Sequence, residues 1–298
     1  MTGRTAVRLD GRGVLALSGE DADDFLQGLI TNDLRRLAPD RALWAALLTP
    51  QGRVLFDFGV VRAEDTLLLD VERARAGELA RRLALYRLRA RVAICERSEA
   101  WTVLAVPGPE AAERFALPRE RGRARRLGEA LVFVDPRSIE LGVRALVPAD
   151  RFAAFLLEHG LELLPEERFE VHRIRLGVPE GARDLPPERA LPLEANFDAL
   201  DIVSFTKGCF VGQEVTARME HRGLVRKRLV PVRFLGPPPA EGAPVRLEDR
   251  EVGEIRRVAG EHGLALLRAE AFGRAGLRAE ETELLVEPPA WLVEELQP

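Results

Sequence analysis

The sequence predicts an α+β protein of two or three domains, the last of which is a small antiparallel β-barrel or sandwich. The chain has 298 residues, and a single hydrophobic core usually stops growing at about 250–300 residues. Predicted strands and helices alternate in two successive units of similar order, whereas short strand patterns punctuated by Gly and Pro follow residue 226. The mixed order favours α+β subdomains, and the short strands favour an all-β domain at the end.

The first predicted subdomain, residues 1–100, has the order strand, helix, three strands, helix and strand. Apolar residues at helical spacing follow the turn residues at 18–21, and Pro50-Gln51-Gly52 is predicted to join two strands. The predicted segments are a strand at 14–17, a helix from 22, strands at 44–49, 53–61 and 67–71, a helix at 72–87 and a strand at 91–95.

The second predicted subdomain, residues 101–225, repeats a similar order and either follows the first or is interleaved with it. Its segments are a strand at 101–106, a helix near 109–115, an arginine-rich link at 119–126, strands at 130–134 and 141–147, helices at 150–159 and 166–176, and a loop at 181–192. The third predicted domain, residues 226–298, contains strands at 228–235, 244–247, 251–258, 264–268 and 283–286.

Composition excludes several classes of protein. Hydrophobic residues make up 46% and charged residues 31% of the chain, as in a soluble globular protein. A net charge of −4 argues against electrostatic binding of nucleic acid by the protein as a whole. One basic segment, Arg222, Arg226, Lys227 and Arg228, is either a solvated strand edge or a local contact for phosphate or an acidic partner. No run approaches the ~20 apolar residues of a membrane span.

The two cysteines, Cys95 and Cys209, provide no disulfide framework, and no Cys or His cluster has the spacing of a zinc site. Cys95 lies in an apolar strand pattern, where we expect it to be a small buried hydrophobic residue. The polar start of the chain lacks the apolar core of a secretory signal. We therefore expect a reduced, cytoplasmic setting.

The stretch at 191–223 contains one of the two cysteines and one of the two lysines, side by side in Lys207-Gly208-Cys209. Gly208 and Gly212 allow the backbone to bend around Cys209. Lys207 and the amides of a helix starting near Gly212 would favour the thiolate. Three interpretations stay open: a merely exposed or structural thiol, a thiol that contacts a ligand or cluster, and a nucleophile for which His221 is the nearest histidine in sequence.

Two further features near this chemistry can be interpreted from the residues alone. A helix from Gln213 would place Glu214 and Arg218 four residues apart, a pairing worth about 0.3 kcal/mol when exposed. It would also turn Gln213 and Arg218 toward the same loop. Asp57 interrupts an apolar strand, so its side chain lies either on a solvated face or in a polar pocket. The sequence contains neither a GxxxxGK[ST] phosphate loop nor a GxGxxG after a predicted strand.

At these residues the chain resembles the YgfZ family of folate-binding proteins, and within it the branch that contains the mitochondrial iron–sulfur assembly factor. The specific match is Lys207-Gly208-Cys209-Phe210-Val211-Gly212-Gln213-Glu214, with phenylalanine where the family commonly has tyrosine. The resemblance continues at 177–181, 184–187, 191–196, 204–206, 216–218 and 226–228, and more weakly at 25–28, 31–33 and 52–53. It therefore covers nearly the whole chain.

The resemblance implies two related α+β subdomains around a central opening that binds tetrahydrofolate, followed by a C-terminal antiparallel β-barrel. It implies a role in the assembly or repair of iron–sulfur proteins, including radical-SAM enzymes that modify tRNA. Cys209 would be the functional thiol and a possible cluster contact, with Lys207 as its activator. The folate region would comprise Asp57, Gly208, Gly212, Gln213, Glu214 and Arg218.

The same fold is similar to the aminomethyltransferase of the glycine cleavage system, which places on folate an aspartate that aligns with Asp57. Asp70 and Arg175 stand where that enzyme has an asparagine and a glutamate. These changes, and the cysteine signature, favour a folate binder over a glycine-cleavage enzyme. A folate-dependent transferase of aminomethyl or one-carbon groups is the alternative function.

Overall fold

The computed structural model describes residues 4–223 and 225–293. By its internal contacts the chain forms two units, each assembled from separate parts of the sequence. The first comprises the described residues of Met1–Leu48, with Leu55–Phe169 and Asp201–Val211, and the second comprises Thr49–Val54, Glu170–Leu200 and the described residues of Gly212–Pro298.

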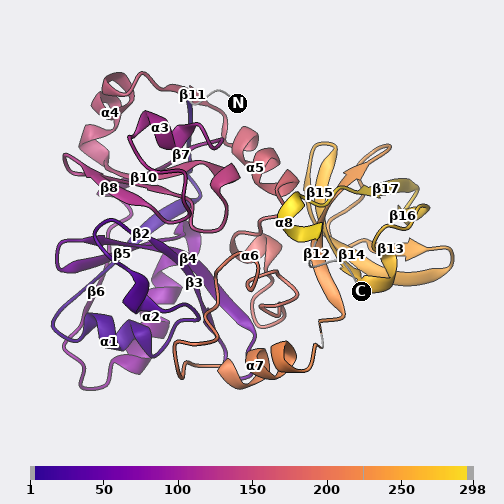
Figure 1. Cartoon of the computed structure of the whole chain (residues 1–298), viewed down its shortest axis with the longest axis horizontal. Helices are drawn as coiled ribbons and strands as arrows, with labels where there is room; N and C mark the ends of the chain where they lie inside the picture. Colours follow the sequence, from indigo (N-terminus) through magenta and orange to yellow (C-terminus); the bar gives the residue numbers. More distant parts are fainter. Residues whose placement is uncertain (1–3, 224, 294–298) are drawn as a thin grey trace. The chain divides into compact units, whose positions relative to one another are not determined.

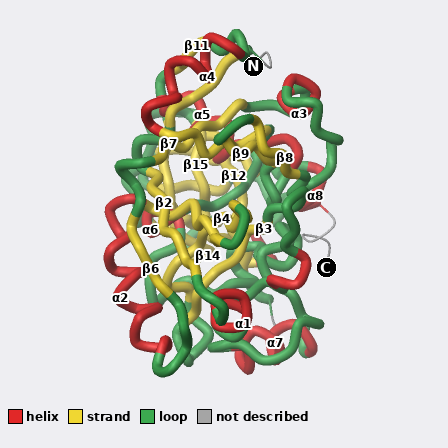
Figure 2. The backbone as a smooth tube through the Cα atoms, turned by 90° about the vertical axis from the view of Figure 1, so that its left-hand side faces the viewer, coloured by secondary structure: helices red, strands yellow, loops and turns green. Residues whose placement is uncertain are grey.

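The first unit contains a five-stranded sheet in the order β3-β4-β5-β2-β6. The strands are β2 (Arg12–Ser18), β3 (Leu43–Leu48), β4 (Val54–Ala63), β5 (Thr66–Glu72) and β6 (Ala93–Glu96), and the helices are α1 (Ala22–Gln27) and α2 (Ala76–Arg87). Helix α2 packs along β6 and β2 (Figure 2). Alternate strand residues form one core with helix residues such as Leu26, Leu79 and Leu83, which explains the period-2 pattern of the strands.

A six-stranded sheet, also in the first unit, has the order β11-β1-β7-β10-β9-β8. Its strands are β1 (Thr5–Arg8), β7 (Trp101–Val106), β8 (Ala124–Leu127), β9 (Ala130–Val134), β10 (Val143–Pro148) and β11 (Glu162–Leu164), with α3 (Ala111–Arg114) and α4 (Phe152–Glu158) between them in sequence. Strand β8 falls in the segment that we predicted to be an arginine-rich link. The prediction missed it because a charged edge strand lacks an apolar alternation.

The C-terminal strands form a closed barrel in the order β12-β15-β14-β13-β16-β17, drawn in orange to yellow in Figure 1. They are β12 (Lys227–Phe234), β13 (Pro244–Leu247), β14 (Arg250–Ala259), β15 (His262–Arg268), β16 (Leu277–Ala279) and β17 (Thr282–Val286). Every pair of neighbouring strands in the barrel is antiparallel. The barrel prediction is therefore confirmed, and the strand that it missed, β16, has only three residues.

Four helices complete the elements that matter for the site: α5 (Glu166–Arg175), α6 (Gly181–Asp184), α7 (Gln213–His221) and α8 (Ala290–Val293). Helix α6 lies in a stretch that we predicted to be a loop; it has only four residues, too few for a helical period to be visible in sequence. The predicted helices at 166–176 and from Gln213 correspond to α5 and α7.

Candidate functional site

The candidate site lies on the faces of the two sheets that are turned away from their helices. The residues on either side of Trp44 in β3, Asp57 in β4 and Asp70 in β5 belong to the helix-covered core. Because strand side chains alternate, these three point to the opposite face. The same argument applies to Arg144 in β10. Since Arg144 forms an ion pair with Asp70, the two sheets enclose a shared polar layer.

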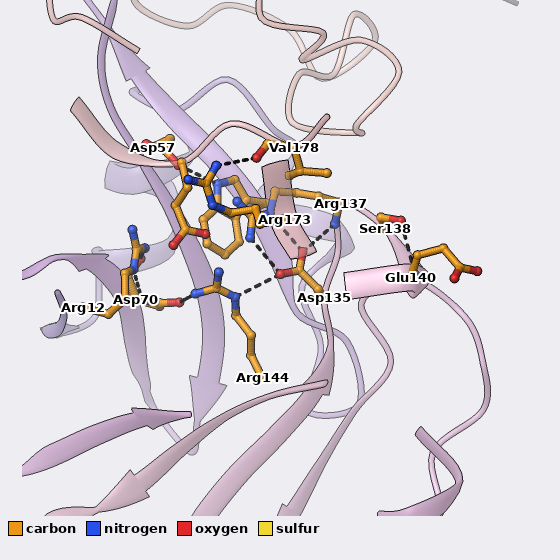
Figure 3. Close-up of polar contacts among 12 residues, drawn as sticks. Arg12, Asp57, Asp70, Asp135, Arg137, Ser138, Glu140, Arg144, Arg173 and Val178 are labelled. Atoms are coloured by element: carbon orange, nitrogen blue, oxygen red, sulfur yellow. Dashed lines mark hydrogen bonds and ion pairs between the residues drawn. The ribbon is translucent and has the colours of Figure 1, made fainter. Parts of the chain in front are cut away.

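A chain of buried ion pairs runs through this polar layer (Figure 3). Arg12 Nε lies 2.7 Å from Asp70 Oδ1, and Arg144 Nη1 lies 2.6 Å from Asp70 Oδ2. Arg144 Nε also reaches Asp135 Oδ2 at 2.9 Å, and Arg137 Nη2 reaches the same oxygen at 2.8 Å. Burial opposes the ionisation of Asp135, but Arg137 and Arg144 outweigh it and hold the pKa of this carboxyl below its ordinary value.

Trp44 joins these charges to Asp57. Its side chain is fully buried, and the indole Nε1 donates to Asp57 Oδ2 at 3.1 Å. The guanidinium carbon of Arg137 lies 3.6 Å from the ring centroid, and that of Arg144 lies at 4.8 Å, distances at which a cation is attracted to the ring face. Gly59 makes room for the ring, because a Cβ there would lie 3.1 Å from Trp44.

Asp57 occupies a buried polar position, and not a solvated face. Only 6% of the residue is exposed, and its carboxylate accepts the indole hydrogen bond from Trp44. Asp70, which replaces the asparagine expected by resemblance to the aminomethyltransferase, is held by two arginines. Arg175, the other residue that differs from the aminomethyltransferase, is exposed at the end of α5. Of the two differing residues, Asp70 is therefore the one that lies in the polar layer with Asp57.

The thiol loop, residues 204–211, displays Cys209 at the surface of the first unit. Gly208 adopts a left-handed φ of +96°, and a Cβ at this position would meet nothing within 4 Å. On either side of the exposed thiol the loop is held in place: Ser204 N donates to Thr31 O at 3.0 Å, and Val211 packs against the helix-covered core. The loop is therefore anchored at both ends around a thiol that solvent can reach.

Lys207 is buried beneath this loop, with 6% of the residue exposed. Its Nζ donates to the carbonyl oxygens of Gln27 at 2.7 Å, Ile30 at 2.6 Å and Asn32 at 2.7 Å. An ammonium group has three protons and no acceptor. These three hydrogen bonds therefore use every proton that Lys207 carries in its charged form.

Burial lowers the pKa of the Lys207 amine to about 8, although the charge of Asp33 opposes the shift. Between this value and the ordinary 10.5, the unfolded chain binds more protons at Lys207 than the folded protein does. We therefore expect the free energy of unfolding of the wild type to rise, relative to that of Lys207→Met, as the pH increases through this window. Urea denaturation of both proteins from about pH 7 to about pH 10 measures this, and a pH-independent difference would contradict it.

The remaining predicted folate-region residues lie in the second unit, at the start of α7. Gly212 precedes the helix with a φ of +80°, and Gln213 opens it. The predicted pair of Glu214 and Arg218 is confirmed at 2.7 Å. Both of its side chains are largely exposed, so it contributes little to stability. A Cβ on Gly52 would lie 3.0 Å from Gly212 O, so the 50–52 turn packs closely against this helix start.

Two predictions about surface exposure are wrong. Arg228 is not part of an exposed basic segment, because its guanidinium is buried and forms two hydrogen bonds with Asp198, at 2.7 and 2.8 Å. Arg222 and Arg226 are exposed. Cys95 is also exposed, and not buried, because β6 is the edge strand of its sheet.

Sequence reasoning missed most of the polar layer, namely Arg12, Trp44, Asp135, Arg137 and Arg144. One signal was available for Arg144, which interrupts the apolar strand pattern at 141–147 just as Asp57 interrupts its own. A charge in such a strand requires a buried partner or a solvated face. The identity of the partner, 74 positions away in sequence, is not visible locally.

Comparisons with known proteins agree with this architecture. The model of the GCVT N-terminal domain matches residues 10–122, and that of the CAF17 C-terminal beta-barrel domain matches residues 226–294. The fold is similar to that of the glycine cleavage system aminomethyltransferase T from Bartonella henselae, with a TM-score of 0.75 over 97% of this chain and 86% of that chain, at 18% identity. The protein thus has a GCVT-type α+β fold with a CAF17-type barrel, which confirms the predicted fold class.

Curated relatives specify the family. The chain is 38% identical to the mitochondrial iron-sulfur cluster assembly factor IBA57 of Homo sapiens, over 95% of this chain and 84% of that protein. It is 36% identical to the same factor of Mus musculus, over 94% of this chain and 82% of that protein. The chain belongs to the family of the iron-sulfur cluster assembly factor IBA57.

These relatives overturn the expectation of a cytoplasmic location, because their names place them in mitochondria. Unpaired cysteines indicate a reducing compartment but do not distinguish one such compartment from another. Within residues 4–223 and 225–293, no helix has the length and apolar character needed to cross a membrane.

Proposed function

We propose that this protein is an accessory factor for the assembly or repair of iron–sulfur proteins and that it binds tetrahydrofolate or a related folate. The observation that carries the proposal is its 38% identity, over 95% of the chain, to a protein named an iron-sulfur cluster assembly factor. The exposed thiol of Cys209, held on an anchored loop, supports it, because cluster chemistry uses accessible cysteine sulfur. The resemblance to the YgfZ family adds radical-SAM enzymes that modify tRNA as a proposed client class.

The polar layer suits a folate. A pterin presents N–H donors on one edge, and the buried carboxylate of Asp57 is an acceptor for such donors. Trp44 fixes the orientation of Asp57 through the indole hydrogen bond, so the acceptor is preorganised. We propose that Asp57 contacts the pterin, and that Gly208, Gly212, Gln213, Glu214 and Arg218 belong to the wider folate region. A bound folate would supply a carrier for one-carbon groups.

The alternative, a folate-dependent transferase of aminomethyl or one-carbon groups, shares the fold and Asp57. It is less favoured, because the similarity to the aminomethyltransferase T is confined to the fold at 18% identity. Asp70 also differs from the residue expected in that enzyme, and its carboxylate is already occupied by Arg12 and Arg144.

The role of the thiol is tested by complementation. In cells that lack the native gene, Cys209→Ala should restore only part of the activity of iron–sulfur enzymes, whereas the wild type should restore all of it. Cys95→Ala is the matched control, because Cys95 is the other exposed thiol of the chain. Full rescue by Cys209→Ala would remove the thiol from the function.

Folate binding is tested by calorimetric titration with tetrahydrofolate. We expect Asp57→Asn to weaken binding by about 10- to 150-fold, as for the loss of a charge-assisted hydrogen bond of about 1.5–3 kcal/mol. Asp65→Asn is the control, because Asp65 is exposed in the turn between β4 and β5. Equal affinities of the wild type and Asp57→Asn would exclude Asp57 as the pterin contact, and no binding by the wild type would exclude folate as a ligand.

A further inference from the structure

The carbonyl oxygens of Gln27, Ile30 and Asn32 form a cage around the Nζ of Lys207. The distances are 2.7, 2.6 and 2.7 Å. The cage begins at the last residue of α1 and includes residues from the segments at 25–28 and 31–33, which resemble the YgfZ family weakly. The proposed function assigns no role to these two segments. Both the cage and the thiol loop belong to the first unit.

Side chains hold the cage rigid. Asn32 Nδ2 donates to Trp44 O at 2.9 Å and to Asp201 O at 2.6 Å. Gln27 Oε1 accepts from Leu34 N at 2.7 Å, and Gln27 Nε2 donates to Asp33 Oδ1 at 2.9 Å. These bonds fix both cage residues that have polar side chains. The three carbonyl oxygens are therefore held in place as a binding site for a compact cation, here the ammonium group of Lys207.

The geometry leaves Lys207 no proton for the neighbouring thiol. An ammonium group donates three hydrogen bonds, and the three carbonyl groups accept all of them. Only Gly208, in a left-handed conformation, separates Lys207 from Cys209, so the anchored lysine limits how far the thiol can move.

We propose that Lys207 is a positioning residue, which fixes the thiol loop by binding the carbonyl cage, and that it does not activate Cys209 by hydrogen bonding to its sulfur. The proposal deepens the proposed function, on which the importance of Cys209 rests. It also explains why this position has one of only two lysines in a chain rich in arginine. A planar guanidinium cannot direct three protons at carbonyl groups arranged around one nitrogen, whereas an ammonium can.

The test measures the mobility of the thiol directly. In a Cys95→Ser background, a nitroxide attached to Cys209 reports loop motion by electron paramagnetic resonance. We expect a slowly tumbling spectrum for the wild-type lysine and a faster component for both Lys207→Met and Lys207→Arg. Val132→Ala is the control. It leaves a cavity in the separate core of the six-stranded sheet, so it lowers stability without altering the cage, and we expect an unchanged spectrum.

Arginine separates positioning from activation. If Lys207 activates the thiol, by a hydrogen bond or through its charge, Lys207→Arg keeps the wild-type pH midpoint of Cys209 alkylation because it retains both, and only Lys207→Met raises it. If Lys207 positions the loop, both variants show the same increase in mobility, because neither fits the cage. Wild-type mobility in Lys207→Met, or wild-type behaviour of Lys207→Arg in both measurements, would overturn the proposal.

A second variant covers the case in which the Lys207 substitutions prevent folding. Asn32→Ala removes the side chain that braces the cage but keeps the charge of Lys207, so we expect it to increase nitroxide mobility in the same direction. An unchanged spectrum for this variant would overturn the proposal. These measurements need neither folate nor a cluster. Their failure is therefore distinguishable from a failure of the proposed function, which the Cys209→Ala complementation tests separately.

Discussion

Replacement of Arg144 by methionine is expected to lower the free energy of unfolding by about 3–5 kcal/mol, the range observed when one partner of a buried ion pair is removed. Arg144 is 1% exposed and binds both Asp70, at 2.6 Å, and Asp135, at 2.9 Å. Methionine preserves much of the apolar volume, so the loss reports the two carboxylates that lose a partner. Urea denaturation followed by circular dichroism measures the change.

The matched control for this variant is Arg126→Met in β8 of the same sheet. Arg126 pairs with Glu64 at 2.6 Å, but both side chains are more than half exposed. Exposed pairs contribute about 0–1 kcal/mol. A loss of similar size in the two variants would show that burial does not make the Arg144 pairs important for stability.

Replacement of Trp44 by alanine is expected to lower the free energy of unfolding by about 3–5 kcal/mol, as for other buried aromatic side chains. The ring is fully buried and faces the guanidinium groups of Arg12, Arg137 and Arg144. Its loss would leave a cavity and remove the indole donor to Asp57. Thermal and chemical denaturation both measure the effect.

Trp44→Phe separates the two contributions of this residue. It keeps an aromatic ring against the arginines but removes the Nε1 hydrogen bond to Asp57, so we expect a smaller loss, of about 1–3 kcal/mol. If Asp57 binds the pterin, Trp44→Phe should also weaken tetrahydrofolate binding, because the carboxylate loses the donor that orients it. Stability equal to that of Trp44→Ala would mean that the hydrogen bond, and not the packing, dominates.

The fold could be predicted largely because its elements have strong local patterns. Strands such as β7, predicted at 101–106 and observed at Trp101–Val106, alternate or are continuously apolar. The prediction failed where the pattern is short or charged, as in β8 with its two exposed arginines and in β16 with three residues. Such strands form because a neighbouring strand offers unpaired backbone groups, and this is a property of the assembled sheet.

The candidate site was predicted only in part. Asp57 and the Lys207-Gly208-Cys209 loop were identified because uncommon residue types stand out against an apolar strand or an arginine-rich chain. The predicted activation of Cys209 by Lys207 followed from their adjacency in sequence. The structure shows the lysine side chain donating to three carbonyl groups, the observation from which we propose its positioning role. Its effect on the reactivity of the thiol stays a prediction.

Local sequence patterns sufficed to predict most of the longer elements in their order, the α+β class with a terminal all-β domain, and the surface pair of Glu214 and Arg218. Each of these depends on residues a few positions apart, whose spacing decides which face of a helix or strand they share. Two pairings follow only from the folded chain: Arg144 neutralises Asp70 and Asp135, and Lys207 binds carbonyl groups 175 to 180 positions away. Buried charges must find partners wherever the fold places them, and local periodicity carries no information about that pairing.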